Sequence, residues 1–129
     1  MKLVARQTIA AIIEVWNGAP TDRLAPLLAS NYRGHTLGVS KGERDRDGYA
    51  NAIEGYREAN PGVVFHIVEQ FDAGDRCVTR LEARRPSAPT RASSTSHGVN
   101  IARFDDVGLL SEEWAIWSPW LDDESPRVT

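Results

Sequence analysis

Arg80 and Glu82 stand two residues apart in a stretch, residues 76–85, whose alternating pattern predicts a strand. Residues two apart lie on the same face of a strand, so this guanidinium and this carboxylate would be neighbours. Burial disfavours a charged carboxylate and an adjacent arginine favours it, and the balance can suit such a pair to proton transfer near neutral pH. The alternative is an exposed ion pair that contributes ~0–1 kcal/mol.

The histidines are further candidates, because an imidazole titrates close to neutral pH. His35 could assist Glu82 by polarising a carbonyl or accepting a proton, or it could be a loop histidine bonded to the backbone. His97 begins a predicted strand and could face either a cavity or a partner subunit. His66 alternates with apolar neighbours, so we expect it to face outward.

Aromatic residues are numerous for a chain of this length, and the default explanation is that they fill the hydrophobic core. A sharper interpretation is an aromatic-lined pocket for a flat ligand, since offset ring stacking adds ~0.5–1.5 kcal/mol beyond the burial of area. We expect Trp114 and Tyr32 at that cavity. The full set is Trp16, Trp114, Trp117, Trp120, Tyr32, Tyr49 and Tyr56.

Two kinds of periodicity predict the elements that position these groups. Apolar residues at three- and four-residue steps predict helices, and β-branched or aromatic residues at period two predict strands. The expected helices are residues 3–16, a short one after Thr21 and residues 46–59; the expected strands are residues 63–71, 76–85, 94–104 and 109–120, with short pairing near residues 36–40.

Helices first and antiparallel strands afterwards predict an α+β fold. About three N-terminal helices would pack on a curved, mostly antiparallel sheet and enclose a pocket. One domain over residues 1–121 and a polar C-terminal tail, residues 122–129, complete the prediction.

Composition excludes several function classes. The 129 residues carry a formal net charge of −3 with no clustered basic surface, which argues against nucleic-acid binding. The one cysteine, Cys77, excludes a disulfide framework and a cysteine-based zinc site, and the Asp45–Asp47 pair lacks a third metal ligand. No apolar run approaches the ~20 residues of a membrane helix, so we expect a cytoplasmic protein without membrane contact.

Six short segments together resemble the SnoaL-like polyketide cyclases of the NTF2-like superfamily, over about residues 3–121. Each is weak alone, and their order along the chain carries the resemblance. They are Tyr32-Arg33-Gly34-His35, Gly48-Tyr49, Pro61, Gly74-Asp75-Arg76-Cys77-Val78-Thr79-Arg80, Gly98-Val99-Asn100-Ile101-Ala102-Arg103-Phe104 and Gly108-Leu109-Leu110-Ser111-Glu112-Glu113-Trp114.

The resemblance implies a cone-shaped fold, homodimers formed through the sheet, a small hydrophobic metabolite as ligand, and no metal or organic cofactor. Enzymes of this kind cyclise polyketides, isomerise ketosteroids or open epoxides. In each reaction a carboxylate or histidine in an apolar pocket moves a proton beside an oxygen atom. The same fold also serves as a passive binding module, so it does not decide the function.

One departure from the family pattern decides the candidate site. Many of these cyclases carry an acid/base Asp four residues after the last-strand Trp, and here that position is Ser118, after Trp114. If another residue performs the acid/base step, the Arg80–Glu82 pair is available, similar to the Arg-x-Asp of limonene-epoxide-hydrolase-like relatives. If no residue performs it, the protein is a non-catalytic ligand-binding or accessory protein.

We therefore predict a cofactor-independent cyclase or isomerase for a hydrophobic oxygenated metabolite, with Glu82 as proton-transfer group, oriented by Arg80 and assisted by His35. The alternatives are a binding protein and an epoxide-hydrolase-like enzyme. A homodimer is expected because Cys77, Leu81 and Trp117 would otherwise expose apolar surface on the outer face of the sheet. The predicted substrate-binding residues are Tyr32, Trp114, Ser118, Tyr49, Trp16 and His97.

Overall fold

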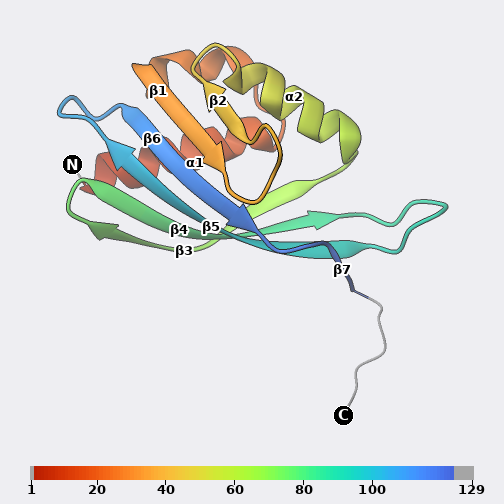
Figure 1. The fold of residues 1–129 in the computed structure, drawn as a ribbon. Helices are drawn as coiled ribbons and strands as arrows, with labels where there is room; N and C mark the ends of the chain where they lie inside the picture. Colours follow the sequence, from red (N-terminus) through yellow and green to blue (C-terminus); the bar gives the residue numbers. More distant parts are fainter. Residues whose placement is uncertain (1, 124–129) are drawn as a thin grey trace.

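Two helices cover one face of a curved sheet in the computed structural model, which describes residues 2–123 (Figure 1). The predicted α+β class, with helices packed on a mostly antiparallel sheet, is confirmed. The elements are α1 (Lys2–Trp16), the short 3₁₀ helices η1 (Thr21–Arg23) and η2 (Ala25–Leu27), β1 (Leu28–Thr36), β2 (Glu43–Asp45), α2 (Tyr49–Ala59), β3 (Val64–Ala73), β4 (Arg76–Arg85), β5 (Ser94–Phe104), β6 (Leu110–Trp117) and β7 (Leu121–Asp122).

The strands form one sheet in the order β2-β1-β6-β5-β4-β3, and β7 pairs with β5. All neighbours are antiparallel except β1 and β6, which run parallel. In that parallel pair Gly34 lies opposite Glu113 and His35 lies opposite Trp114. The pairing brings an early segment of the chain beside the last long strand, where the candidate site forms.

Helix α1 packs against the sheet through residues at helical spacing. Ile9, Ile12 and Val15 are buried in the core that also holds Cys77 of β4. Burying one such aliphatic side chain stabilises the fold by about 1.5–3 kcal/mol. At the end of the helix the Asn17 side chain bonds both backbone groups of Phe65, at 2.9 and 2.7 Å, and so fixes α1 to β3.

The two faces of β4 are the reverse of those predicted. Cys77 and Leu81 are buried toward the helices, whereas Arg80 is exposed on the outer face. Trp117 of β6 also lies on the helix side, where its ring contacts Phe65. The expectation that Cys77, Leu81 and Trp117 form an apolar outer face is therefore wrong, because these three side chains face the helices.

Several predicted boundaries also change. Residues 28–36 form strand β1, which was not predicted. β1 pairs with β2 and with β6, and its pairing with β6 reaches Thr36, at the start of the short pairing expected near residues 36–40. The expected second helix is two 3₁₀ turns, and the third begins at Tyr49, after Asp45 Oδ1 accepts the Gly48 N–H at 2.8 Å. β7, which pairs with β5, spans the predicted domain end at residue 121. Of the predicted tail, residues 124–129 lie outside the described residues.

Candidate active site

A cavity of about 230 Å³ lies between the helices and the concave face of the sheet. Aromatic and aliphatic side chains make most of its wall, with polar groups among them. It is lined by Ile9, Ile12, Ile13, Trp16, Thr36, Val39, Arg44, Tyr49, Tyr56, Phe65, Leu81, Ser96, Asn100, Glu113, Ala115, Trp117, Ser118 and Trp120.

The aromatic part of the wall is a set of edge-to-face contacts. The ring centroids of Trp16 and Phe65 lie 5.3 Å apart, and those of Phe65 and Trp117 lie 5.7 Å apart. Gly98, opposite Trp117 on β5, makes this packing possible, because a Cβ at residue 98 would lie 2.5 Å from the indole ring. This part of the cavity is therefore a rigid apolar surface suited to a flat ligand.

The polar part centres on Glu113, which is 3% exposed. Its Oε2 accepts a hydrogen bond from the Tyr32 hydroxyl and one from Arg44 Nη2 at 3.1 Å. Its Oε1 accepts one from Asn100 Nδ2 at 2.8 Å. Tyr32 stacks on Tyr49, with ring centroids 5.3 Å apart, and the Arg44 guanidinium lies 4.3 Å from the centre of the Tyr49 ring. A buried carboxylate is thus held by three donors from three different strands.

An irregularity in β6 directs Glu113 into the core. Arg103 pairs with Glu112 but Phe104 pairs with Leu110, so one extra residue, Ser111, interrupts the register. Leu110 and Glu113 are consequently both buried, although simple alternation would place them on opposite faces. Glu113 was not predicted at the cavity, because its neighbour Trp114 was expected there. Period-two alternation, which puts Glu113 and Trp114 on opposite faces of the strand, is the sequence pattern that indicates Glu113 once Trp114 is known to face outward.

Gly34 leaves the space that the cluster occupies. A Cβ at this position would lie 2.3 Å from the Tyr32 hydroxyl and 2.8 Å from Arg44 Cζ. β1 and β2 pair at this point with Gly34 opposite Arg44, so the Arg44 guanidinium occupies the space beside Gly34.

Burial sets the ionisation of the groups around Glu113. It raises the pKa of Tyr32 and of Tyr49 well above the ordinary value, and the Glu113 charge raises both further. Burial acts to lower the pKa of Arg44, but Tyr49 and Glu113 outweigh it and the net pKa is raised. Both tyrosines therefore remain hydrogen-bond donors, and Arg44 remains charged, throughout the physiological range.

We expect the protein to lose stability as the pH rises above about 10, the ordinary pKa of tyrosine. The pKa values of Tyr32, Tyr49 and Tyr56 are all raised in the folded chain. The unfolded chain therefore releases these protons first, so the free energy of unfolding is undiminished below about pH 10 and falls by up to about 1.4 kcal/mol per pH unit for each tyrosine above it. Urea unfolding at increasing pH, with phenolate absorbance recorded in parallel, measures this. Phenolate formed near pH 10 while the fold is intact would contradict it; Tyr32→Phe should reduce the slope.

Three of the predicted substrate-binding residues line the cavity: Trp16, Tyr49 and Ser118. Tyr32 is 1% exposed and lies behind the wall, where it holds Glu113. Ser118 Oγ accepts the backbone N–H of His97 at 3.0 Å and donates to the Pro119 carbonyl at 3.0 Å, so its hydroxyl is already engaged.

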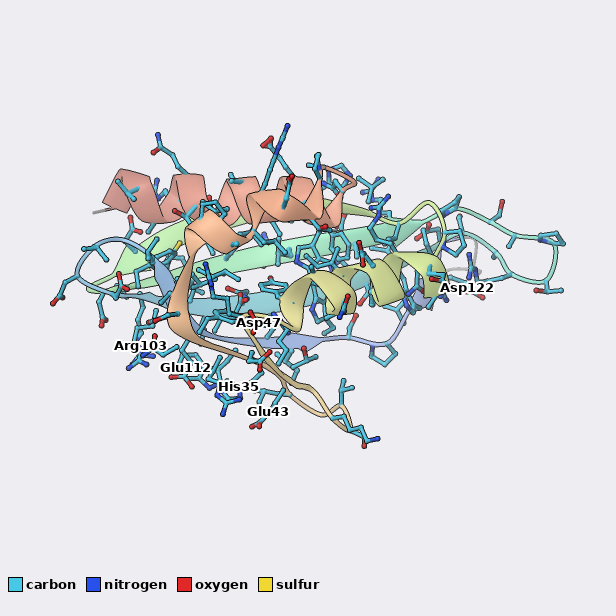
Figure 2. The ribbon with its side chains drawn as sticks, turned by 90° about the horizontal axis from the view of Figure 1, so that it is seen from above. His35, Glu43, Asp47, Arg103, Glu112 and Asp122 are labelled. Atoms are coloured by element: carbon cyan, nitrogen blue, oxygen red, sulfur yellow. The ribbon has the colours of Figure 1, made fainter. Side chains whose placement is uncertain are left out.

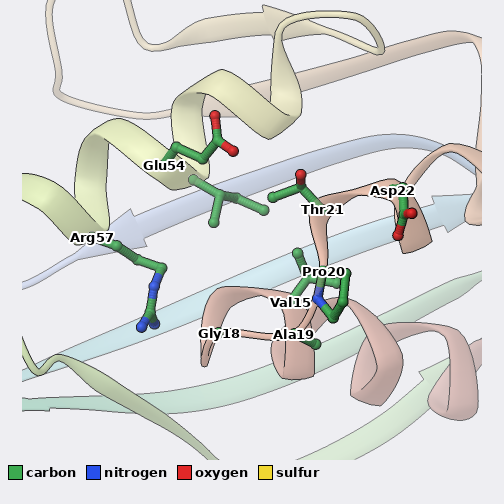
Figure 3. A pocket seen from close by; sticks show the side chains of 9 residues that line it. Val15, Gly18, Ala19, Pro20, Thr21, Asp22, Glu54 and Arg57 are labelled. Carbon is green, nitrogen blue, oxygen red and sulfur yellow. The ribbon is translucent and has the colours of Figure 1, made fainter.

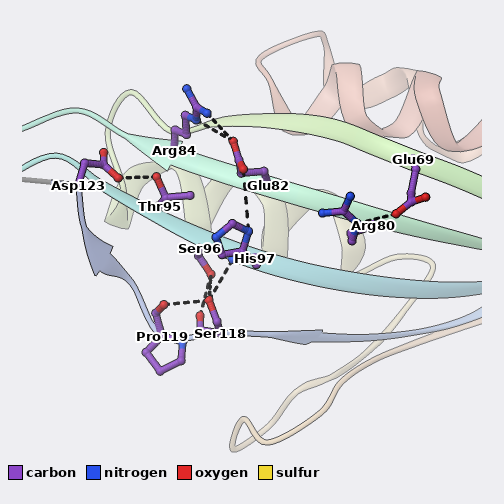
Figure 4. A network of polar contacts seen from close by, with 10 residues as sticks. All are labelled: Glu69, Arg80, Glu82, Arg84, Thr95, Ser96, His97, Ser118, Pro119 and Asp123. Carbon is purple, nitrogen blue, oxygen red and sulfur yellow. Dashed lines mark hydrogen bonds and ion pairs between the residues drawn. The ribbon is translucent and has the colours of Figure 1, made fainter. Parts of the chain in front are cut away.

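Glu82 and Arg80 lie on the outer face of the sheet and do not line the cavity (Figure 4). Arg80 Nε donates to Glu69 at 2.7 Å, and Glu82 pairs with Arg84 at 2.7 Å. The expectation that Arg80 orients Glu82 inside the pocket is wrong. The two side chains share a face as predicted, but it is the face opposite the helices.

His97 also lies on the outer face, with its Nδ1 3.9 Å from Glu82 Oε2 (Figure 4). His97 is exposed and does not line the cavity, so the prediction that it binds substrate is wrong.

His35 and Trp114 were predicted at the cavity, but the structure places them on the outer face, where their rings stack 5.7 Å apart. His35 contacts Glu112 at 2.8 Å and Glu43 at 3.2 Å, a group labelled in Figure 2. The physical reason is alternation: Gly34 and Glu113 turn inward, so their neighbours His35 and Trp114 turn outward.

A second hollow, of about 570 Å³, lies between the end of α1, η1 and α2 (Figure 3). Its rim carries the exposed acids Asp22 and Glu54, and Arg57 there donates to the Trp16 carbonyl at 2.5 Å. The hollow lacks the aromatic lining of the smaller cavity, so we take the smaller cavity as the candidate active site.

Within residues 2–123, no group of three or more His, Cys, Asp or Glu side chains is placed to hold a metal ion. Over the same range, no helix is both long and apolar enough to cross a membrane.

The SnoaL-like domain family matches residues 9–113, most of the chain. This protein belongs to that family. No match is found among curated proteins.

Solved structures with the same fold include wild-type IdmH, a proposed polyketide cyclase from Streptomyces antibioticus, which is 23% identical, with a TM-score of 0.75 and coverage of 88% of this chain and 91% of IdmH. A protein of unknown function with a cystatin-like fold from Methylobium petroleophilum is 14% identical, with a TM-score of 0.77 over 98% of this chain and 84% of the other. An LEH-like epoxide hydrolase of M. tuberculosis is 15% identical, with a TM-score of 0.69 over 91% and 84%. The cone-shaped NTF2-like fold is confirmed.

Proposed function

We propose that the protein is a cofactor-independent enzyme that moves a proton beside a carbonyl group of a small hydrophobic metabolite, as a cyclase or isomerase, with Glu113 as the proton-transfer group. The observation that carries this proposal is a buried carboxylate on the wall of an apolar cavity, held by Tyr32, Arg44 and Asn100. A passive binding protein would need no carboxylate here, and burying one requires the converging donors that this site provides.

Glu113 keeps the capacity to accept a proton. A carboxylate offers about four lone-pair sites, and Tyr32, Arg44 and Asn100 use three. Oε2 has two donors and Oε1 one, so Oε1 is the atom that would take a proton from the α-carbon of a bound ketone. The C–H electron pair then forms the enolate double bond, and the carbonyl π pair moves to the oxygen.

Tyr49 is suited to stabilise that enolate oxygen. Its hydroxyl accepts the Trp16 indole N–H at 3.2 Å, so its own hydrogen is directed elsewhere. Tyr49 lines the cavity, and its raised pKa keeps the hydroxyl protonated. Fixed donors of this kind, aimed at the position where negative charge develops, are among the largest contributions to enzymatic rate.

Epoxide opening would require the Arg80–Glu82 pair in the cavity, and both residues lie on the outer face, so we do not extend the proposal to it. The passive binding alternative needs no carboxylate in the pocket. Glu113 with its three donors favours the enzyme over that alternative.

We expect the protein to accelerate deuterium exchange at C1 of 2-tetralone in deuterium oxide, a reaction that requires only α-proton removal and return. This bicyclic ketone matches the cavity in size and carries an acidic C–H beside its carbonyl. Proton NMR measures the exchange rate with and without protein. If the wild-type protein catalyses deuterium exchange at C1 no faster than the same concentration of the Glu113→Gln variant, the proposed function is overturned.

We also infer a homodimer formed through the outer face of the sheet. Phe71, Val78, Ile101 and Trp114 lie side by side on β3, β4, β5 and β6 and form an outer apolar row, of which Phe71 is 54% and Ile101 38% exposed. Arginine and glutamate residues flank the row on both sides. Across a two-fold axis, the arginines of one copy would then face the glutamates of the other. The cytoplasmic location stays a prediction.

Ile101→Asp should convert the dimer to a monomer, because it places a charge at the centre of the outer apolar row. Sedimentation velocity at micromolar concentration measures this. Val107→Asp is the matched control, since Val107 is 80% exposed in the turn before β6 and should leave the dimer intact. A wild-type protein that sediments only as a 14.3 kDa species would contradict the inference.

A further inference from the structure

The volume of the cavity limits the size of its ligand. At about 230 Å³, it lies between the cavity of about 150 Å³ that holds benzene and the pockets of about 300 Å³ or more that hold drug-sized ligands. We propose that the ligand is a compound of one or two fused rings that donates a hydrogen bond from a hydroxyl or enol group to Asn100. The proposal rests on the proposed function and specifies its substrate class.

The cavity has an apolar and a polar region, which orients such a ligand. Trp16, Phe65 and Trp117 provide ring faces and edges, while Glu113 and Asn100 provide the polar region. A fused bicycle would place its rings on the aromatic wall and its oxygen beside Asn100. A third fused ring would need more room than this cavity gives, so we expect it to weaken binding.

Asn100 is the residue that selects a donor. It is 8% exposed on the cavity wall, and the bond from its Nδ2 to Glu113 Oε1 determines the orientation of its amide. Its Oδ1 is buried and has no hydrogen-bond partner among the described residues. A buried carbonyl oxygen without a donor is unfavourable, and a ligand hydroxyl would supply the missing bond once a small shift of the Asn100 side chain turns Oδ1 toward the cavity.

Ser96 shows the contrast on the same strand and face. Its hydroxyl donates to the Ser118 carbonyl at 2.7 Å, so its hydrogen-bonding need is met within the protein. Both residues line the cavity, but only the amide oxygen of Asn100 gains a bond when a donor binds. Asn100 and Ser96 therefore form a matched pair for an experiment.

The test is isothermal titration calorimetry with unreactive aromatic probes. We expect 2-naphthol to bind about 10-fold more tightly than 2-methylnaphthalene, which has the same number of heavy atoms, and than 2-methoxynaphthalene, which can only accept. We expect 2-hydroxyanthracene, with a third ring, to bind at least about 10-fold more weakly than 2-naphthol. Asn100→Leu should abolish the preference for 2-naphthol, and Ser96→Ala should keep it.

Equal affinities of the wild-type protein for 2-naphthol and 2-methylnaphthalene would overturn the donor requirement, as would an unchanged preference in Asn100→Leu. Tight binding of 2-hydroxyanthracene would overturn the size limit. If Asn100→Leu does not fold, the wild-type affinities alone decide between these outcomes. The probes undergo no proton transfer at carbon, so their failure is distinct from a failure of the 2-tetralone exchange.

Discussion

Glu113→Gln should lower the exchange rate of 2-tetralone by about 10²–10⁴-fold, the usual contribution of a general base. The amide has nearly the shape of the carboxylate but has no comparable basicity, so proton abstraction fails while the cavity keeps its form. Binding of 2-naphthol should change much less than the exchange rate, because the aromatic wall and Asn100 are unaltered. Circular dichroism and calorimetry together separate a loss of chemistry from a loss of fold.

The chain provides a matched control in Glu112, the preceding residue of β6. Glu112 lies on the outer face, where it contacts His35 at 2.8 Å and Arg103 at 2.8 Å. Glu112→Gln removes the same charge one residue away and should leave the exchange rate within about two-fold of wild type, because its carboxylate does not reach the cavity. Equal losses in the two variants would show that charge or stability, and not the position of Glu113, governs the rate.

Arg44→Met should destabilise the fold by about 3–5 kcal/mol, the usual effect of removing one partner from a buried ion pair. The Arg44 and Glu113 side chains are 14% and 4% exposed, and Arg44 also lies over the Tyr49 ring. Without the guanidinium, the Glu113 carboxylate loses its counter-charge and keeps only neutral donors. Chemical denaturation measures the free energy of unfolding, and thermal melting should show a decrease of about 10–20 °C.

Two further variants establish the cause of that loss. Arg103→Met breaks an ion pair of 2.8 Å whose arginine is 41% exposed, and it should change the stability by less than about 1 kcal/mol. In the double variant Arg44→Met/Glu113→Gln the buried charge is absent, so it should be more stable than Arg44→Met alone. Additive effects of the two substitutions would contradict a direct coupling between Arg44 and Glu113.

The strands and first helix could be predicted closely because their information is local. Apolar residues at helical spacing predicted residues 3–16, and α1 is Lys2–Trp16. The predicted strands 76–85 and 94–104 coincide with β4 and β5. Residues 28–36, by contrast, do not alternate apolar and polar residues and contain a glycine, and they form β1 because β6 and β2 supply pairing partners distant in sequence.

The candidate site depended on which face of each strand turns inward, and period two alone leaves that choice open. Trp16, Tyr49 and Ser118 were predicted at the ligand and line the cavity, while Glu82, Arg80, His35, Trp114 and His97 turn outward. The apolar residues Cys77 and Leu81 indicate the inward face of β4, whereas the prediction took the face of Arg80 and Glu82 as the inward one.

Local patterns predict the α+β class and a pocket between helices and sheet, because amphipathic periodicity and turn residues act over a few positions, and the six short segments indicate the family. Only the tertiary structure shows that Glu113 is the buried carboxylate of the cavity. The extra residue at Ser111 turns Glu113 inward, and the parallel pairing of β1 with β6 brings Gly34 and Arg44 beside it. A buried carboxylate is stable only where donors from distant segments converge on it, and that convergence is a property of the folded sheet.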